Sequence, residues 1–89
     1  MQGIPKLTQR HLRAINGLWR GPIMREALDR LAGCSNSPEL VRQLRQMGLK
    51  IICQKVPVID RDGKVCKAGR YEFAPEDIVI LRTWGLEAA

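Results

Sequence analysis

The sequence predicts one small α+β domain in which three helices come first, a β-hairpin follows and a short helix ends the chain. Three observations predict it. The chain has 89 residues, which is enough for one modest core. Apolar residues recur at helical spacing up to about residue 50, after which β-branched residues alternate. The pair Asp62-Gly63 then separates two β-branched runs, which is typical of a hairpin turn.

The first helix is expected to begin after Thr8, a good N-cap residue, and to end at Gly21-Pro22. Its apolar stripe consists of Leu12, Ile15, Leu18 and Trp19. A second helix follows almost at once and ends at Gly33, a natural C-terminal cap. The expected buried side of this second helix consists of Ile23, Ala27, Leu28 and Leu31.

The third helix follows a tight turn at 34–39, and two starts are open. Either Ser37 precedes a first helical residue Pro38, or Asn36 caps the helix with Glu39 three residues later. Gly48 ends this helix. Its expected buried stripe consists of Leu40, Val41, Leu44 and Met47.

The hairpin is predicted to have long arms, at 51–58 and 65–73, and a charged tip at 60–64. Pro75 and two acids then favour another helix start, and the helix is expected to run to Trp84. The apolar run at 78–81 is equally compatible with a buried strand.

Composition argues against an enzyme and for a polyanionic partner. Lys and Arg outnumber Asp and Glu by 15 to 9, although many small basic domains bind no nucleic acid. The three cysteines have neither disulfide-framework nor metal-knuckle spacing, so we expect reduced, partly buried thiols. The single histidine, His11, is expected on a helix surface, and no catalytic set, metal site or cofactor site is predicted. Without a signal-peptide pattern or a membrane-spanning run, the expected location is the cytoplasm.

The predicted order, with a third helix leading directly into a hairpin, is the connectivity of a winged helix-turn-helix domain. In that fold the outer face of the third helix enters the major groove of DNA. Arg pairs with guanine, Gln with adenine, and Glu accepts from cytosine. The expected base-reading residues are therefore Glu39, Arg42, Gln43 and Gln46. An ordinary solvated helix face is the alternative.

Contacts to the DNA backbone are expected from the helix start and from the hairpin, or wing. Lysines on a hairpin can alternatively serve only to protect its edges. The expected residues on and beside the third helix are Ser35, Asn36, Ser37 and Arg45. Those on the wing are Lys55, Arg61, Lys64, Lys67 and Arg70.

Several of these residues also carry a resemblance to a known family. The runs at 25–28, 41–51, 60–64 and 69–73 resemble the small helix-turn-helix domain family of short phage and prophage proteins. The resemblance covers roughly residues 8 to 75, and Leu40 stands where the family often has Arg. It implies a winged helix that binds DNA. The positions that match the family pattern are Val41, Leu44, Arg45, Gly48, Ile51 and Tyr71.

Two functions from different classes are open. The first is sequence-specific binding of double-stranded DNA by a phage- or prophage-type transcriptional regulator or recombination directionality factor. The second is a non-enzymatic adaptor on the same fold, or an inhibitor of a host complex, docking through the apolar segment 78–84. In either case one domain spans 1–89, with its core at 8–73, and the segment 75–84 can alternatively supply a homodimer contact.

Overall fold

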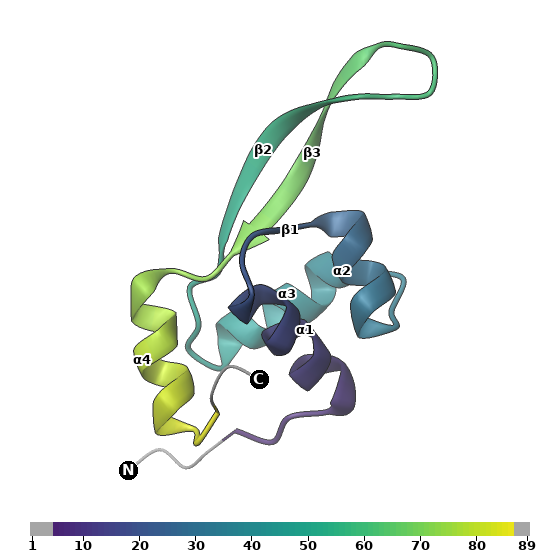
Figure 1. Cartoon of the computed structure of the whole chain (residues 1–89). Coiled ribbons are helices and arrows are strands. Elements are labelled where there is room, and N and C mark those ends of the chain that lie inside the picture. Colours follow the sequence, from purple (N-terminus) through teal and green to yellow (C-terminus); the bar gives the residue numbers. More distant parts are fainter. Residues whose placement is uncertain (1–4, 87–89) are drawn as a thin grey trace.

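The computed structural model describes residues 5–86, which form an α+β arrangement of four helices and a three-stranded antiparallel sheet (Figure 1). The α+β class is therefore confirmed. The helices pack together as a body, and the hairpin projects from it as a long arm (Figure 1). The elements are α1 (Gln9–Trp19), β1 (Ile23–Met24), α2 (Arg25–Ala32), α3 (Ser37–Gln46), β2 (Ile52–Ile59), β3 (Val65–Glu72) and α4 (Pro75–Thr83).

Helix α1 begins where predicted, because Thr8 and His11 cap it reciprocally. The Thr8 hydroxyl accepts from the His11 backbone N–H at 3.2 Å, and the Thr8 N–H donates to His11 Nδ1 at 3.0 Å. This capping box satisfies two backbone N–H groups that a helix start leaves without partners. His11 is consequently buried, and its expected place on the helix surface is wrong.

The two-stranded hairpin predicted from the sequence is part of a larger sheet, and this is a correction. Ile23 and Met24, expected in the second helix, form β1 and pair antiparallel with Tyr71 and Arg70 of β3. The strand order is β1-β3-β2. A strand of two residues is too short to show any period, and its partner lies in the distant part of the chain, so no local pattern indicated it.

The connection from α2 to α3 is held by short-range polar contacts. Gly33 ends α2 in the left-handed conformation, with φ of 74°. Asn36 is the N-cap of α3, and its side chain accepts from the Glu39 N–H at 3.4 Å, so the second of the two predicted starts is the observed one. Asp29 Oδ1 accepts from the backbone N–H of Ser37 at 2.7 Å. This bond ties the last turn of α2 to the first turn of α3.

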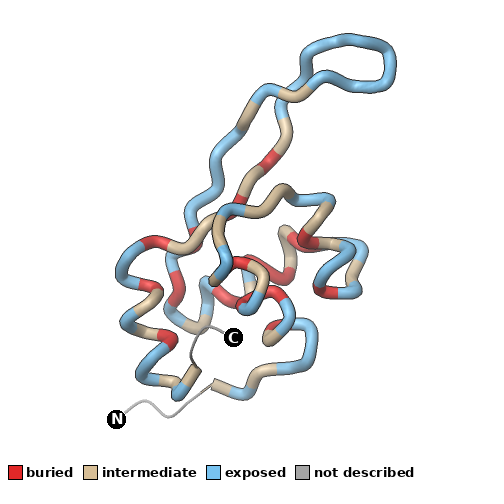
Figure 2. The backbone as a smooth tube through the Cα atoms, viewed as in Figure 1, coloured by how far each residue is buried: buried red, intermediate tan, exposed pale blue. Residues whose placement is uncertain are grey.

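The core lies between the helices and the root of the sheet, where buried positions of every helix meet (Figure 2). Leu31, predicted on the buried side of α2, is 41% exposed, because Leu28 and Ala32 take that side instead. Trp19 and Phe73 pack edge to face, with ring centroids 6.4 Å apart. Burial also raises the pKa of Tyr71. The buried members are Ala14, Ile15, Leu18, Leu28, Ala32, Leu40, Val41, Leu44, Leu49, Ile51, Tyr71 and Leu81.

Helix α4 settles the open alternative for the apolar run at 78–81, which is helical. Its buried Asp77 accepts three backbone N–H groups, from Lys50 at 2.7 Å and from Ile51 and Ala74 at 2.9 Å each. Ile51 needs this support, since its φ of 34° is uncommon for a β-branched residue. Asp77 thus joins the start of α4 to the junction between α3 and the hairpin.

The hairpin has eight rungs, from the pair Ile52–Glu72 to the pair Ile59–Val65. Asp60 shapes the tip, because its side chain accepts from the backbone N–H groups of two later turn residues. The arm is largely exposed beyond its root (Figure 2). Cys53 and Cys66 lie on it and are exposed, which corrects the expectation of partly buried thiols for these two. None of the helices in residues 5–86 has the length and apolar character to cross a membrane.

Candidate nucleic-acid interface

Helix α3 is held on one side and free on the other. Leu40, Val41 and Leu44 are buried against the body, as the helical pattern predicted. Successive residues of a helix are rotated by about 100°, so side chains between these positions point outwards. Arg42 and Gln46 are exposed on this outer side. Both long polar side chains are accessible to a partner, and Arg42 is also paired with Glu39.

Glu39 and Arg42 act as a pair on the outer side of α3. Arg42 Nε donates to Glu39 Oε2 at 2.8 Å, and Arg42 Nη2 forms a second, shorter bond with Oε1. The hydrogen bond from Arg42 lowers the pKa of Glu39, and the same bond raises the pKa of Arg42. A partner base that engages Arg42 must therefore compete with Glu39, or bind the two side chains as a unit.

Gln43, predicted to read bases, lies partly buried between α1 and α3. Its Oε1 lies 2.8 Å from His11 Nε2, and its Nε2 donates to Glu39 Oε1 at 3.5 Å. Because His11 Nδ1 accepts from the Thr8 N–H, the ring proton sits on Nε2 and points at Gln43. Both ends of the Gln43 amide are thus occupied, and the bidentate adenine contact is closed to it in this conformation.

Ser37, predicted to contact the DNA backbone, is wholly buried. Its N–H donates to Asp29, and its hydroxyl donates to the carbonyl of Arg25 at 3.3 Å. The hydrogen bond to Ser37 is the main reason why the pKa of Asp29 is lowered. Ser37 is therefore not part of the candidate interface, and its hydrogen bonds join α3 to α2. Ser35 and Asn36 beside it are exposed, although the side-chain oxygen of Asn36 accepts the capping hydrogen bond from Glu39.

Arg45 is exposed, but its guanidinium bonds to main-chain carbonyls of this chain. Its Nη2 donates to the carbonyl of Ile51 at 2.6 Å, and its Nε lies 3.2 Å from the carbonyls of Lys50 and Ile51. These bonds hold the end of α3 to the first residues of the hairpin. The guanidinium of Arg45, which was expected to contact the DNA backbone, is thus already bonded within the protein.

The basic residues of the hairpin are divided between free and engaged side chains. Lys55, Arg61, Lys64 and Lys67 are exposed along the arm and tip. Arg70 lies at the root, where Nη2 donates to Gln54 at 2.8 Å and Nε is buried without a hydrogen-bond partner. The four outer residues are placed to meet a polyanion, whereas Arg70 is held in the sheet.

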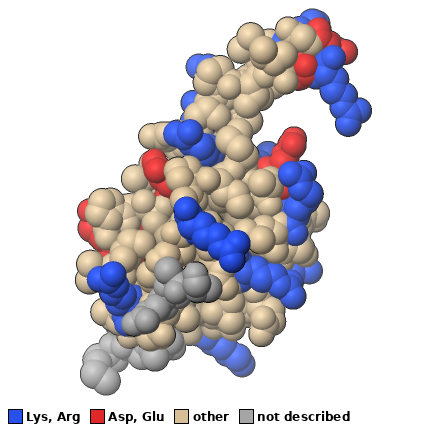
Figure 3. Space-filling model, viewed as in Figure 1, with Lys and Arg blue, Asp and Glu red and all other residues tan. Residues whose placement is uncertain are grey.

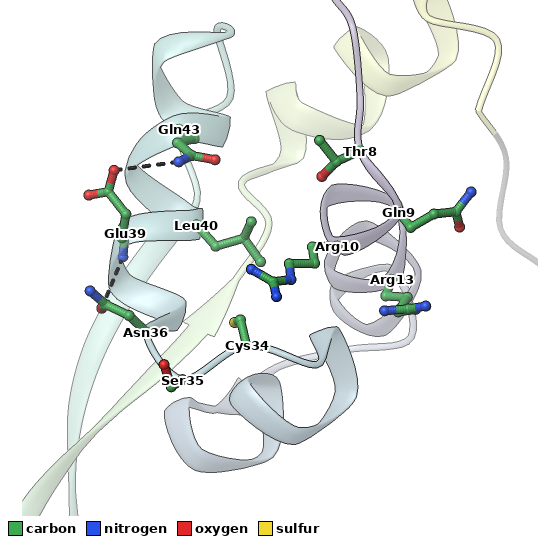
Figure 4. Close-up of a pocket in the computed structure, with 10 residues that line it drawn as sticks. All are labelled: Thr8, Gln9, Arg10, Arg13, Cys34, Ser35, Asn36, Glu39, Leu40 and Gln43. Atoms are coloured by element: carbon green, nitrogen blue, oxygen red, sulfur yellow. Dashed lines mark hydrogen bonds between the residues drawn. The ribbon is translucent and has the colours of Figure 1, made fainter.

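Two further arginines, which the sequence did not single out, border an open hollow of about 560 Å³ between α1 and the start of α3. Figure 4 shows Arg10 reaching from α1 towards Cys34 and Leu40. Arg13 lies one turn further on and donates to the carbonyl of Ala32 at 3.3 Å. Their spacing of three on the polar side of α1 is the signal that could have revealed them.

The charge of the surface is mixed in sign. In Figure 3 the Lys and Arg side chains are spread over the helical body and reach the tip of the arm, where acidic side chains lie beside them. Uncharged residues cover most of the arm between its root and its tip in this view. The chain as a whole carries a formal charge of +6. An extended polyanion suits this distribution better than a small anion at one point.

The apolar segment at 78–84 faces inwards for the most part. Leu81 is buried, and Ile80 and Trp84 pack against the core. Val79 remains 63% exposed. The abundance of large apolar residues in this segment is thus explained largely by the protein's own core.

A scan against known protein families, a search of curated proteins and a search of solved structures found no match to this chain.

Proposed function

We propose that this chain is a sequence-specific double-stranded DNA-binding protein of the winged helix-turn-helix type. In this proposal α3 is the recognition helix and the β2–β3 hairpin is the wing. The order α1, β1, α2, α3, β2, β3 and the sheet order β1-β3-β2 support it, because a third helix then leads straight into a protruding hairpin. We further propose a role as a phage- or prophage-type transcriptional regulator or recombination directionality factor, for which the family resemblance is the support.

The outer face of α3 is the observation that carries the proposal. On the outer side of α3, Arg42, Arg45 and Gln46 are exposed and Glu39 is half-buried, while the inner face is buried. A helix of this kind fits the major groove, which admits one α-helix. Arg42 can contact guanine O6 and N7, and Gln46 can contact adenine N6 and N7. Glu39 orients Arg42 through their ion pair. Gln43 bonds to His11 of α1, and no base contact is assigned to it.

Phosphate contacts are assigned to exposed cations on two sides of α3. On one side lie the wing residues Lys55, Arg61, Lys64 and Lys67, and on the other lies Arg10 of α1 beside the hollow. Such contacts position the protein without reading sequence and make its affinity depend on salt. Ser35 and Asn36, in the turn before α3, are the other exposed candidates there, although the side-chain oxygen of Asn36 caps the helix.

The test is fluorescence anisotropy of the protein with labelled duplexes of about 20 to 30 base pairs, random and genomic, across a salt series. Affinity should fall log-linearly with salt, and one duplex should bind far more tightly than the rest. Arg42→Ala should weaken that duplex by about 5- to 150-fold and relax the preference at one base pair. Lys64→Ala should weaken all duplexes alike and reduce the salt slope by about 1.

Arg82→Ala is the matched control. It removes the same charge as Arg42→Ala from an exposed position on α4, outside the proposed interface. Binding should therefore change little. If no duplex binds at low salt, or if Arg42→Ala and Arg82→Ala weaken binding equally, α3 is not a DNA reader.

A further inference from the structure

Two large apolar side chains stand opposite each other at the outer end of the arm. Ile59 and Val65 form the last rung of the hairpin, and they are 75% and 72% exposed. No other large apolar residue in 5–86 is as exposed. Neither side chain belongs to the core cluster. Water contact with this much apolar surface is unfavourable, so the pair gains most from a partner that covers it.

The face on which this pair lies also carries the lysines of the arm. Side chains of a strand alternate between two faces, and directly paired residues share one face. The rungs Lys55–Gly69, Pro57–Lys67 and Ile59–Val65 therefore point to the same side. The rungs between them, Val56–Ala68 and Val58–Cys66, face the other side and carry no charge. One face of the arm is thus both basic and apolar.

At the root of the arm, this basic and apolar face is the one that packs on the helices. Tyr71 is separated from Lys67 and Val65 by even numbers of residues along β3, so the three belong to the same face, and Tyr71 is buried in the core. The face with the lysines and the apolar pair is therefore continuous, along a twisted ribbon, with the face that packs on the core at the root. The outer face of α3 and this side of the arm can bind a single partner together.

The charges favour a polyanion over a second copy of the chain. Association of two arms through this face would bring Lys55 and Lys67 against their own copies, which is unfavourable. Pairing through the outer edge of β2 is hindered by Pro57, which has no N–H to donate. A duplex offers phosphates to the lysines and, between its stacked bases, an apolar interior to the pair. DNA therefore matches both features of the face.

The length of the arm suits this partner. Eight residues of strand at about 3.3 Å each give a reach of roughly 26 Å from the root. With α3 in the major groove, the next minor groove is about half a turn away, or roughly 17 Å. Insertion of apolar side chains between base steps there opens the narrow groove and kinks the duplex.

We propose that the Ile59–Val65 pair is a wedge that enters the minor groove beside the α3 site, unstacks one base step and bends the DNA. This inference rests on the proposed DNA-binding function and adds a mode of action to it. A flexible pyrimidine–purine step, such as TA or CA, is the step that yields most easily to such a wedge. Lys55 and Lys67 hold the phosphates on either side of the widened groove.

The experiment measures bending separately from binding. A duplex of about 30 base pairs, chosen as the tightest binder in the anisotropy series, carries a donor and an acceptor dye at its two ends. Energy transfer is recorded at saturating protein. The test variant is Ile59→Thr with Val65→Thr, which keeps β-branched residues in the strands. The matched control is Val58→Thr with Cys66→Ser, which changes the neighbouring rung on the opposite face.

The wild-type protein and the control variant should raise energy transfer equally, and the test variant should lose at least half of that rise while still saturating the duplex. Replacement of the flexible step by an A-tract should reduce the rise for the wild type as well. Saturation without any rise, or equal loss in both variants, overturns the wedge and leaves DNA binding intact. Absence of binding at low salt overturns the proposed function and the wedge together. Sedimentation that shows a wild-type dimer and a monomeric test variant, with energy transfer unchanged, assigns the pair to self-association instead.

Discussion

Replacement of Asp77 by alanine should lower the free energy of unfolding by about 3–6 kcal/mol. The buried carboxylate accepts backbone N–H groups from Lys50, Ile51 and Ala74 at 2.7, 2.9 and 2.9 Å. A hydrogen bond to a charged group contributes about 1.5–3 kcal/mol, and an unsatisfied buried donor loses a similar amount. The bonds to Ile51 and Ala74 are buried, whereas the Lys50 N–H is only partly buried and can turn to water. Two lost bonds therefore set the estimate.

Such a loss is large for this chain. At roughly 0.05–0.15 kcal/mol per residue, 89 residues give about 4–13 kcal/mol of total stability. Urea unfolding, followed by the fluorescence of Trp19 and Trp84, measures the change. Asp77→Asn should cost less, about 1–2 kcal/mol, because Ile51 and Ala74 both bond to Oδ2 and one amide oxygen can still accept from both.

Glu76→Ala supplies the matched control for Asp77→Ala. Glu76 is adjacent in the first turn of α4, but its side chain is exposed and its ion pair with Lys50, at 3.2 Å, lies at the surface. An exposed pair of this kind contributes about 0–1 kcal/mol. If Asp77→Ala unfolds at the same urea concentration as Glu76→Ala, the buried carboxylate does not hold the junction between α3 and the hairpin, and the reasoning is refuted.

Three further predictions concern the connections around α3. The pKa of Asp29 is lowered, chiefly by its hydrogen bond with Ser37, so the stability that it adds is complete above the pKa of an unfolded-chain aspartate and is lost as pH falls through the lower folded value. Asp29→Asn should thus flatten the acid side of a stability-against-pH curve measured by urea unfolding, and an unchanged curve would contradict this. His11→Ala and Gln43→Ala should be coupled by about 0.5–2 kcal/mol in a double-mutant cycle, because their side chains bond directly, whereas additive losses would exclude that coupling. Gly33→Ala should cost about 1 kcal/mol in thermal or urea unfolding because its φ is 74°, and Gly33→Asn should cost less, so equal costs would argue against conformational strain.

Helices α1, α2 and α3 were predictable from the sequence because their signals are local, whereas the apolar run of α4 was equally compatible with a strand. Thr8, Asn36 and the glycines after α2 and α3 mark helix ends, and the buried stripe of α3 has clear helical spacing. The hairpin was predictable for a similar reason, since Asp62-Gly63 lies between two β-branched runs. Strand β1 was not, because its existence depends on pairing with Tyr71 rather than on any pattern of its own.

The candidate site was less predictable than the fold, because side-chain engagement depends on tertiary contacts. Ser37 and Gln43 have the residue types of surface contacts, yet Asp29 and His11 draw them into internal hydrogen bonds. Arg45 is similarly held by the carbonyl of Ile51. A helical wheel gives the direction of a side chain but not the partner that it meets. The burial of a polar residue therefore cannot be predicted from the spacing of residues alone.

The length of the exposed arm has a consequence for how the molecule opens. A two-stranded ribbon without a covering layer is only marginally stable in water, so the outer rungs should separate and re-form without unfolding of the helical body. Amide hydrogens near Ile59 and Val65 should exchange with solvent quickly, whereas those of Ile51 and Tyr71 should exchange only when the whole fold opens. A ligand that holds both strands would slow exchange in the outer rungs selectively. Hydrogen exchange would thus report a bound arm whatever the chemical identity of the ligand.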